Sequence, residues 1–308
     1  MSLNKLKKRY QAGQINKEEY ITQMHKSHQH LFQYADLIED TDIDTLEIRN
    51  REIVIKTQKR DIQLFASRTD MRIAPMEMLN FGFYDENELD IIEKLIPEDV
   101  VFFDIGANVG WYSLNIAKMK KDACIYAFEP IPKTFDALRK NIQLNNMDGI
   151  SIHPIGFSNK TGTLVFYYYP EVSGNASLAN LSNRHDVENI DCRVIRLDDF
   201  IKEYTGRNID FIKCDVEGAE LSVFEGGLKT LQTHKPIIFT EMLRKWAALH
   251  EYHPNEIIDL LTGIGYKCFT LNGKHLRSFA RVDENTHETN YFFLHPEKHD
   301  LQIKEFSF

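Results

Sequence analysis

Short apolar runs alternate with helical stretches from about residue 100 onward. Helical periodicity is clearest at 134–145 and 254–264. Strands that are apolar on both faces and alternate with helices form a parallel sheet covered on each side. The last two apolar runs follow one another without a clear helix, so an antiparallel strand fits there. The pattern therefore predicts an α/β domain with seven mostly parallel strands, at 100–105, 124–129, 150–157, 209–216, 236–242, 266–271 and 290–295.

The first 40 residues have a helical pattern without strands. Leu3, Leu6 and Tyr10 recur at helical spacing, and Asn16 and Glu19 have the spacing of a capping box that opens a second helix. The run LNKLKKRYQAGQINKEEYITQMHKSH is similar to the helix-turn-helix hairpins of SHOCT type. Such a hairpin has too little apolar surface to fold alone, so we expect it to pack on its own chain or on a second copy.

Residues 45–70 change to short β-prone runs between charged turns, which predicts a small β hairpin. Asp85 and Glu88 have the spacing of another capping box, placed before a helical stretch. Pro75 marks the expected entry to the main domain. We divide the chain into a helical hairpin, a small β appendage and an α/β domain, at 1–44, 45–75 and 76–308.

Composition narrows the class of protein. The chain is 43% hydrophobic and 27% charged, which suits a globular protein with a sizeable core. Acidic residues exceed basic ones by 46 − 37 = 9, which disfavours a nucleic-acid partner. No apolar run reaches the ~18 residues of a membrane span, and the basic N-terminus lacks the apolar core of a secretory signal. The cysteines fit free thiols in a reducing compartment, so we expect a cytoplasmic protein.

The first strand of the α/β domain ends in a glycine loop that suits a small ligand. It reads Asp104-Ile-Gly106-Ala-Asn108-Val-Gly110, and ligands bind at the carboxyl ends of strands in open α/β sheets. Trp111 takes the place of the third glycine in a dinucleotide fingerprint, which makes a pyrophosphate site doubtful. An acid that opens the turn also suits a cationic ligand better than a phosphate.

The second strand ends in Phe128-Glu129-Pro130, and Glu129 lies 25 residues after Asp104. An acid at this place can accept hydrogen bonds from both hydroxyls of a ribose. The glycine loop, its leading acid and the ribose acid together fit a nucleoside that carries a positively charged amino acid. S-adenosylmethionine is such a ligand.

The runs DIGANVGWYS, AFEP, IDFIKCDVEGAELSVFEGG and PIIFTEM resemble the FkbM family of S-adenosylmethionine-dependent methyltransferases. The resemblance covers roughly residues 80–295 and implies a class I methyltransferase fold that O-methylates sugar or natural-product hydroxyls. The stretch FGFYDENE resembles the family's Y-E-x-x-E element; which of its acids corresponds stays open, and Glu88 is our candidate. By position, the resemblance implies a cofactor site of Asp104, Gly106, Asn108 and Gly110 at the methionine end and Glu129 and Pro130 at the ribose.

A third group of polar residues ends the next two strands. Strand alternation puts Lys213 and Asp215 on one face, and Glu241 ends the following strand. Adjacent strands lie about 4.8 Å apart, so Asp215 and Glu241 can converge over one pocket. Such a pair suits a general base for a hydroxyl, with Asp215 first and Glu241 second, or a divalent-cation site. An interior Lys–Asp pair that only stabilises the strand ends would give the same pattern.

An insertion at 160–200 lies between the third and fourth strands. It carries Tyr167, Tyr168 and Tyr169 and then the polar run from Pro170 to Ser177. Aromatic rings and small polar residues suit a sugar or polyketide acceptor. An edge hairpin with its turn explains the same residues equally well.

The sequence thus predicts a cytoplasmic S-adenosylmethionine-dependent O-methyltransferase for a small-molecule or glycan acceptor. Two rivals remain: a nucleotide-dependent oxidoreductase on the same sheet, and a non-catalytic scaffold that acts through the helical hairpin. The apolar positions of that hairpin are too many to leave exposed. We expect them to be buried against a second subunit, which makes a homodimer, or otherwise against the β appendage.

Overall fold

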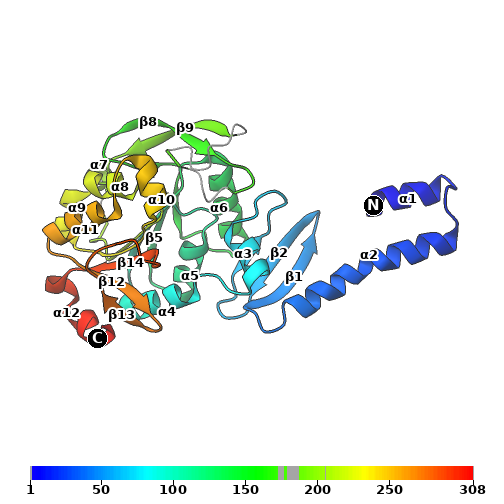
Figure 1. Cartoon of the computed structure of the whole chain (residues 1–308), viewed down its shortest axis with the longest axis horizontal. Coiled ribbons are helices and arrows are strands. Elements are labelled where there is room, and N and C mark those ends of the chain that lie inside the picture. Colours follow the sequence, from blue (N-terminus) through cyan, green and yellow to red (C-terminus); the bar gives the residue numbers. More distant parts are fainter. Residues whose placement is uncertain (1, 173–176, 179–186, 205, 308) are drawn as a thin grey trace.

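The computed structural model describes residues 2–172, 177–178, 187–204 and 206–307. Its centre is a mixed α/β layer built on one eight-stranded sheet (Figure 1). In spatial order the strands are β13 (His275–Ser278), β12 (Lys267–Asn272), β14 (Asn290–Leu294), β11 (Ile237–Glu241), β10 (Phe211–Cys214), β4 (Val101–Ile105), β5 (Cys124–Phe128) and β6 (Ser151–His153).

The direction of the strands agrees with the sequence pattern. Strands β6, β5, β4, β10 and β11 run parallel, and β14 is antiparallel between β11 and β12. All seven predicted strands are present. The additional edge strand β13 pairs with β12 through the two-residue turn Gly273-Lys274, a hairpin signal that the sequence analysis missed. The predicted run 150–157 is also shorter than expected, because Pro154 offers no N–H to continue the ladder after β6.

The order of the strands fixes where a ligand can bind. From β4 the chain moves outward to β5 and β6, and it then crosses back to β10 on the other side of β4. The topological switch point therefore lies between β4 and β10. Open α/β sheets bind ligands outside the carboxyl ends of the strands at such a point.

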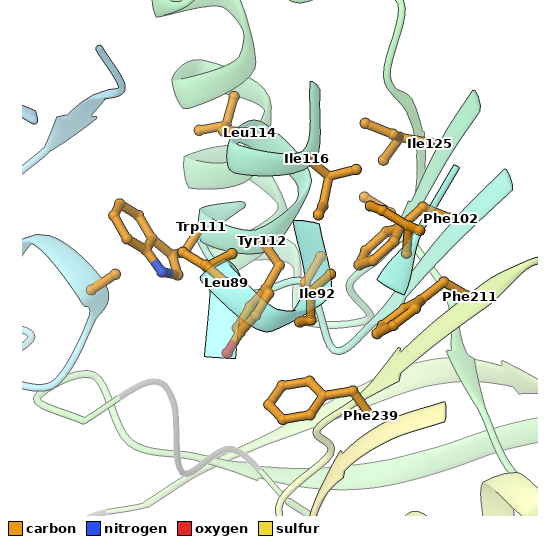
Figure 2. Packing of buried hydrophobic residues seen from close by; sticks show 14 of the residues in the cluster. Leu89, Ile92, Phe102, Trp111, Tyr112, Leu114, Ile116, Ile125, Phe211 and Phe239 are labelled. Atoms are coloured by element: carbon orange, nitrogen blue, oxygen red, sulfur yellow. The ribbon is translucent and has the colours of Figure 1, made fainter. Parts of the chain in front are cut away.

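Helices cover both faces of the sheet, and the alternation of side chains explains why. Phe102 and Phe211 stack on one face with ring centroids 5.1 Å apart, whereas Phe103 and Ile212 point to the other face. Figure 2 shows the first face, where Ile92 and Ile116 lie next to these rings and Leu89 and Leu114 belong to the same buried cluster. The helices of the first face are α4 (Glu86–Leu95), α5 (Trp111–Met119) and α6 (Pro132–Leu144); those of the second are α7 (Leu197–Glu203), α8 (Glu220–Gly226), α9 (Leu228–His234) and α11 (Pro254–Gly263).

The remaining short elements surround this layer. Strand β7 (Gly156–Phe157) pairs with β9 (Glu188–Ile195), which pairs in turn with β8 (Gly162–Tyr168) in a separate three-stranded sheet. The insertion is therefore a hairpin of β8 and β9 outside the central sheet. The other helices are α3 (Ala74–Phe81), α10 (Arg244–Ala247), η2 (Ala248–His250) and α12 (Pro296–Phe306).

The β appendage is a three-stranded antiparallel sheet that docks on the α/β domain. It consists of β1 (Ile43–Arg49), β2 (Glu52–Thr57) and β3 (Gln63–Phe65). Ile55 and Leu64 belong to the same buried cluster as the first face of the central sheet. Asn141 and Asn145 of α6 accept hydrogen bonds from the backbone of β3 at 3.0 and 2.8 Å. The appendage therefore shares its core with the main domain.

The helical hairpin consists of α1 (Leu3–Gln11) and α2 (Lys17–Leu37), and it projects away from the rest of the chain (Figure 1). Asn16 and Glu19 form the predicted capping box, with both side chain to backbone bonds present. Among the described residues of one chain, no residue of α2 is buried, and Ile21 is 55% exposed. The alternative in which the β appendage buries the apolar positions of α2 is therefore wrong. No helix in the described ranges combines the length and the apolar character needed to cross a bilayer.

Candidate active site

The switch point opens into a cavity of about 380 Å³. The segments that follow β4, β5, β10 and β11 all line it, and α3, the start of α5 and the Tyr84-Asp85 turn close it. The cavity thus lies where the strand order predicts a ligand.

The loop after β4 is shaped by a close approach between two backbones. Gly106 has φ +73°, and a Cβ on it would lie 1.9 Å from the carbonyl oxygen of Asp215. Only glycine fits this contact, because any side chain would collide with the segment after β10. Asn108 also has a positive φ of 49°, and both residues line the cavity.

The acid after β5 is held in place by backbone N–H groups. The Glu129 carboxylate accepts hydrogen bonds from the backbone N of Asn108 at 3.1 Å and of Ile131 at 2.9 Å. Burial raises the pKa of Glu129 to about 7, against the lowering effect of these two bonds. Glu129, Pro130 and Ile131 all line the cavity, so this acid is fixed beside the glycine loop.

Two of the residues carried over for the methionine end do not line the cavity. Asp104 is fully buried in β4, where Oδ2 accepts hydrogen bonds from the backbone N and hydroxyl of Ser113 at 3.1 and 2.6 Å. Gly110 is the N-cap of α5, with φ 93°, and a Cβ there would lie 2.7 Å from the Leu138 side chain. Their direct contact with a ligand is therefore not supported, and both instead fix the start of α5.

Lys213 is a buried cation that connects the two sides of the switch point. Its Nζ donates to the carbonyl oxygen of Gly106 at 2.7 Å and lies 3.5 Å from Asp104 Oδ1 and 3.6 Å from Asp215 Oδ2. Burial lowers the pKa of Lys213, but attraction to Asp215 and Asp104 outweighs burial and leaves the pKa above its usual value. Lys213 is therefore charged and cannot serve as a base.

Three carboxylates meet at the acid end of the cavity. Cys214 of β10 pairs with Thr240 of β11, so the next residues, Asp215 and Glu241, lie opposite each other as the sequence predicts. Glu217 joins them, and one oxygen of each of the three lies within 4.8 Å of the others. Burial and the charge of Asp215 hold the pKa values of Glu217 and Glu241 well above their usual range.

Sequence analysis missed Glu217 as a site residue. The residue stands in the run KCDVEGAE, but it follows the end of β10, where strand alternation no longer says which way a side chain points. Its φ of 54° brings it back to the cavity. The neighbouring Glu220 accepts hydrogen bonds from the backbone N of Val216 and Gly218, both at 3.1 Å, so it holds this turn.

The predicted capping box before α4 is absent. In addition, Glu88, which the sequence suggested as a cofactor-binding residue, does not reach the cavity, whereas Asp85 does. Asp85 makes no side-chain cap; its Oδ2 accepts a hydrogen bond from the hydroxyl of Tyr112 at 2.9 Å and lines the cavity. Burial raises the pKa of Asp85 to about 7. Glu88 does not line the cavity, and it accepts a hydrogen bond from Asn290 at 3.2 Å. Asp85 is therefore the acid of this stretch that a ligand would meet.

The aromatic side of the cavity also differs from the expectation. Phe166 and Trp246 line it, whereas Tyr167, Tyr168 and Tyr169 do not. Tyr168 and Tyr169 are buried in the chain's own packing, so their proposed contact with an acceptor is wrong. Residues 173–176 of the predicted polar run lie outside the described residues.

Several buried polar atoms of the cavity wall lack a hydrogen-bond partner among the described residues. They are Asn108 Oδ1, Trp111 Nε1 and Asp215 Oδ1. Unsatisfied buried polar atoms are rare in folded proteins, because each costs about 1–3 kcal/mol.

Comparison with known proteins finds a family whose model covers the residues of this cavity. The family model described as the methyltransferase FkbM domain matches residues 104–268, which include the glycine loop and all three carboxylates. A crystal structure of methyltransferase FkbM from Methylobacillus flagellatus KT aligns with a TM-score of 0.43 at 17% identity, over 71% of this chain and 53% of that chain.

Curated relatives match over less than half of this chain. Methyltransferase 1 of Beauveria bassiana is 29% identical over 147 residues, which is 42% of this chain and 59% of that protein. The hexuronic acid methyltransferase AglP of Haloferax volcanii is 31% identical, over 47% of this chain and 59% of that protein. The 31-O-demethyl-FK506 methyltransferase FkbM of Streptomyces tacrolimicus is 29% identical, over 43% and 61%. The chain spans about three fifths of the length of these relatives.

Proposed function

Because the chain belongs to the FkbM methyltransferase family, we propose that it is an S-adenosylmethionine-dependent O-methyltransferase. The observation that carries the proposal is the pairing of Gly106 and Glu129 at one end of the cavity. Gly106 lets the loop after β4 lie directly against the segment after β10, and Glu129 presents a fixed carboxylate beside that loop. This pairing suits the amino-acid and ribose ends of one nucleoside ligand.

The described residues fit that ligand in detail. Glu129 would accept the ribose hydroxyls, and Pro130 with Ile131 would give an apolar edge next to them. Asn108 and Trp111 line the same end of the cavity. Asp85 lines the opposite wall and is our candidate for the ammonium group, in place of Glu88 and Asp104.

S-adenosylmethionine held by these residues would supply a sulfonium methyl group to an acceptor oxygen. The O–C bond would form as the S–C bond breaks, the sulfur would keep the electron pair of that bond, and the hydroxyl proton would have to leave. The main task of the chain is to hold the two reactants in line, since orientation alone can contribute about 7–11 kcal/mol. Asp215 would take the proton, because its side chain lines the cavity and is 38% exposed there.

Lys213 and Glu241 have supporting roles in this proposal. The positive charge of Lys213 lies 3.6 Å from Asp215 Oδ2, so Lys213 would hold that carboxyl group in position at the edge of the cavity. Glu241 is the second candidate for the base. Alternatively, Asp215, Glu217 and Glu241 would together hold a divalent cation that acidifies the hydroxyl, because three carboxylate oxygens within 4.8 Å suit a hard cation.

The acceptor is proposed to be a small molecule or glycan in the cytoplasm. Trp246 and Phe166 line the cavity, and aromatic rings pack well on the apolar faces of sugars. The names of relatives that act on a hexuronic acid and on 31-O-demethyl-FK506 fit an oxygen acceptor. The net charge of −9 disfavours nucleic acid.

Calorimetric titration with S-adenosylhomocysteine tests the proposal. We expect binding by the full chain, and Glu129→Ala should weaken it by about 1.5–3 kcal/mol, the range for hydrogen bonds to a charged group. Glu305→Ala, an exposed acid on α12, is the matched control and should bind like the wild type. Tight binding of NAD with no binding of S-adenosylhomocysteine would instead support an oxidoreductase, and binding of neither would support a scaffold.

A further inference from the structure

The helical hairpin leaves half of its long helix uncovered. By helix geometry α1 is about 14 Å long and α2 about 32 Å. Leu6 and Ile15 are buried where α1 meets α2, and Tyr10 stacks on Tyr20 with ring centroids 4.5 Å apart. Beyond this contact the large apolar side chains of α2 are exposed. They are Leu31 (56%), Phe32 (62%), Tyr34 (48%) and Leu37 (49%).

The apolar positions of α2 follow a heptad pattern. The positions are spaced by three, four, three, four and three residues. This spacing is typical of the line of contact, or seam, between two packed helices. Ile21, which is 55% exposed, begins the pattern on the covered half of α2, and it continues without interruption to the uncovered half. The seam consists of Ile21, Met24, His28, Leu31 and Ala35, of which His28 alone is polar. Ile38, the C-cap of α2, continues the spacing but packs against the core cluster of the main domain.

Charge is distributed unevenly along the hairpin. Helix α1 carries Lys5, Lys7, Lys8 and Arg9 and no acid. The end of α2 and the turn after it carry Asp36, Glu39 and Asp40, and no lysine or arginine occurs from residue 27 to residue 48. Two parallel copies of α2 would bring the acidic ends together. Two antiparallel copies would bring each acidic end beside the basic α1 of the other copy.

We propose that two copies of the chain pair through their hairpins, with the two α2 helices antiparallel and each α1 covering the exposed half of the partner's α2. This register pairs Ile21 with Ala35 of the seam, and Met24 with the exposed Phe32 beside the seam, across a two-fold axis. The same register places His28 beside its own copy on the axis. The four helices form a closed bundle with a self-complementary interface.

A membrane surface is the other occupant of an exposed apolar helix face, and the charges disfavour it. Amphipathic helices at anionic bilayers carry lysine and arginine beside the apolar stripe. The exposed half of α2 instead ends in three acids. A second copy satisfies both the apolar seam and the charges.

Cysteine cross-linking tests the orientation in the full chain. In a Cys124→Ser background, which removes the exposed cysteine, His28→Cys should give a disulfide-linked dimer under mild oxidation. Ile21→Cys should not, because antiparallel pairing puts the two copies of residue 21 about 21 Å apart, and a disulfide needs Cα atoms within about 7 Å. Cross-linking of both variants would show a parallel pair and overturn the proposal, as would cross-linking of neither.

Light scattering tests the interface itself. The chain of 36.0 kDa should give twice that mass. Leu31→Glu should give the monomer mass, whereas Leu301→Glu, an exposed leucine of α12, should leave the dimer intact. Reversal of charge at Lys5, Lys7 and Lys8 should also give monomers. A monomeric wild-type chain, or a Leu31→Glu variant that stays dimeric, overturns the proposal, and so does a monomer that binds vesicles of phosphatidylcholine and phosphatidylserine.

Discussion

The two ends of the cavity are built in different ways. The end at Gly106 and Glu129, the proposed cofactor end, is shaped by backbone contacts. The loop at Gly106 lies against the segment after β10, and backbone N–H groups hold Glu129. At the acid end, the side chains of Asp215, Glu217 and Glu241 meet from two strands and a turn. The cofactor end is fixed by backbone contacts, so few residue types fit at positions such as Gly106. The acid end is defined by the charged side chains of its three acids.

This contrast separates binding from catalysis. The backbone geometry of the cofactor end would recognise one ligand shape. The acid end instead gathers three carboxyl groups, and under the proposed function an acceptor proton would leave there. Changes at the two ends should therefore give different losses: affinity and stability at the first, turnover at the second.

The largest effect is expected for Asp215→Asn, which keeps the shape of the residue and removes its charge. Turnover should fall by about 10²–10⁴-fold, the usual contribution of general acid–base catalysis, while S-adenosylhomocysteine binding is retained. Turnover is measured as methyl transfer from radiolabelled S-adenosylmethionine to a small-molecule or glycan acceptor that the wild type methylates. Binding of S-adenosylhomocysteine is measured by calorimetry. Asp148→Asn, an exposed acid, is the control.

The same assay with EDTA decides between the two roles of the carboxylates. Activity that persists in the chelator would exclude the divalent-cation version. Activity that is lost in EDTA and restored by Mg²⁺ would support that version and make Asp215 a metal ligand. Normal turnover by Asp215→Asn would contradict both.

Gly106→Ala should give the next largest effect, on stability. Strain from a positive φ costs about 1–3 kcal/mol, and the collision with Asp215 adds to it. Thermal unfolding should show a lower Tm, and cofactor affinity should fall because the loop has to move. Gly149→Ala is the matched control, since no atom lies within 4 Å of its added Cβ. Equal Tm values for the two variants would show that the close approach is not present in solution.

The smallest predicted effect is the pH dependence of cofactor binding. The pKa of Glu129 in the free protein is raised to about 7 by burial. The ribose hydroxyls would be bound by the ionised form, so protons compete with the ligand below this pH. Affinity for S-adenosylhomocysteine should be about tenfold lower at pH 6 than at pH 8. Glu129→Gln cannot ionise and should bind weakly with a flat profile; a slope that persists in this variant would assign the titration to another group.

Two predicted capping boxes with the same spacing show where local sequence is enough to predict a side chain's hydrogen bond and where it is not. Asn16 and Glu19 form theirs, because they lie on a projecting hairpin where only neighbouring backbone competes for the side chains. Asp85 and Glu88 do not, because Tyr112 and Asn290 take their carboxylates. These partners lie 27 and 202 residues away along the chain. Tertiary contacts thus changed which of the two acids reaches the cavity.

The sequence by itself determined the seven strands, the antiparallel edge and the ligand-binding end of the sheet, because apolar periodicity and glycine loops act between near neighbours in the chain. It also placed Asp215 opposite Glu241, since both end adjacent parallel strands. Only the tertiary structure decided that Glu217 joins them, that Asp104 is buried away from the cavity and that Tyr168 and Tyr169 serve as packing. Those outcomes depend on turns and on contacts between distant segments, which no local pattern encodes.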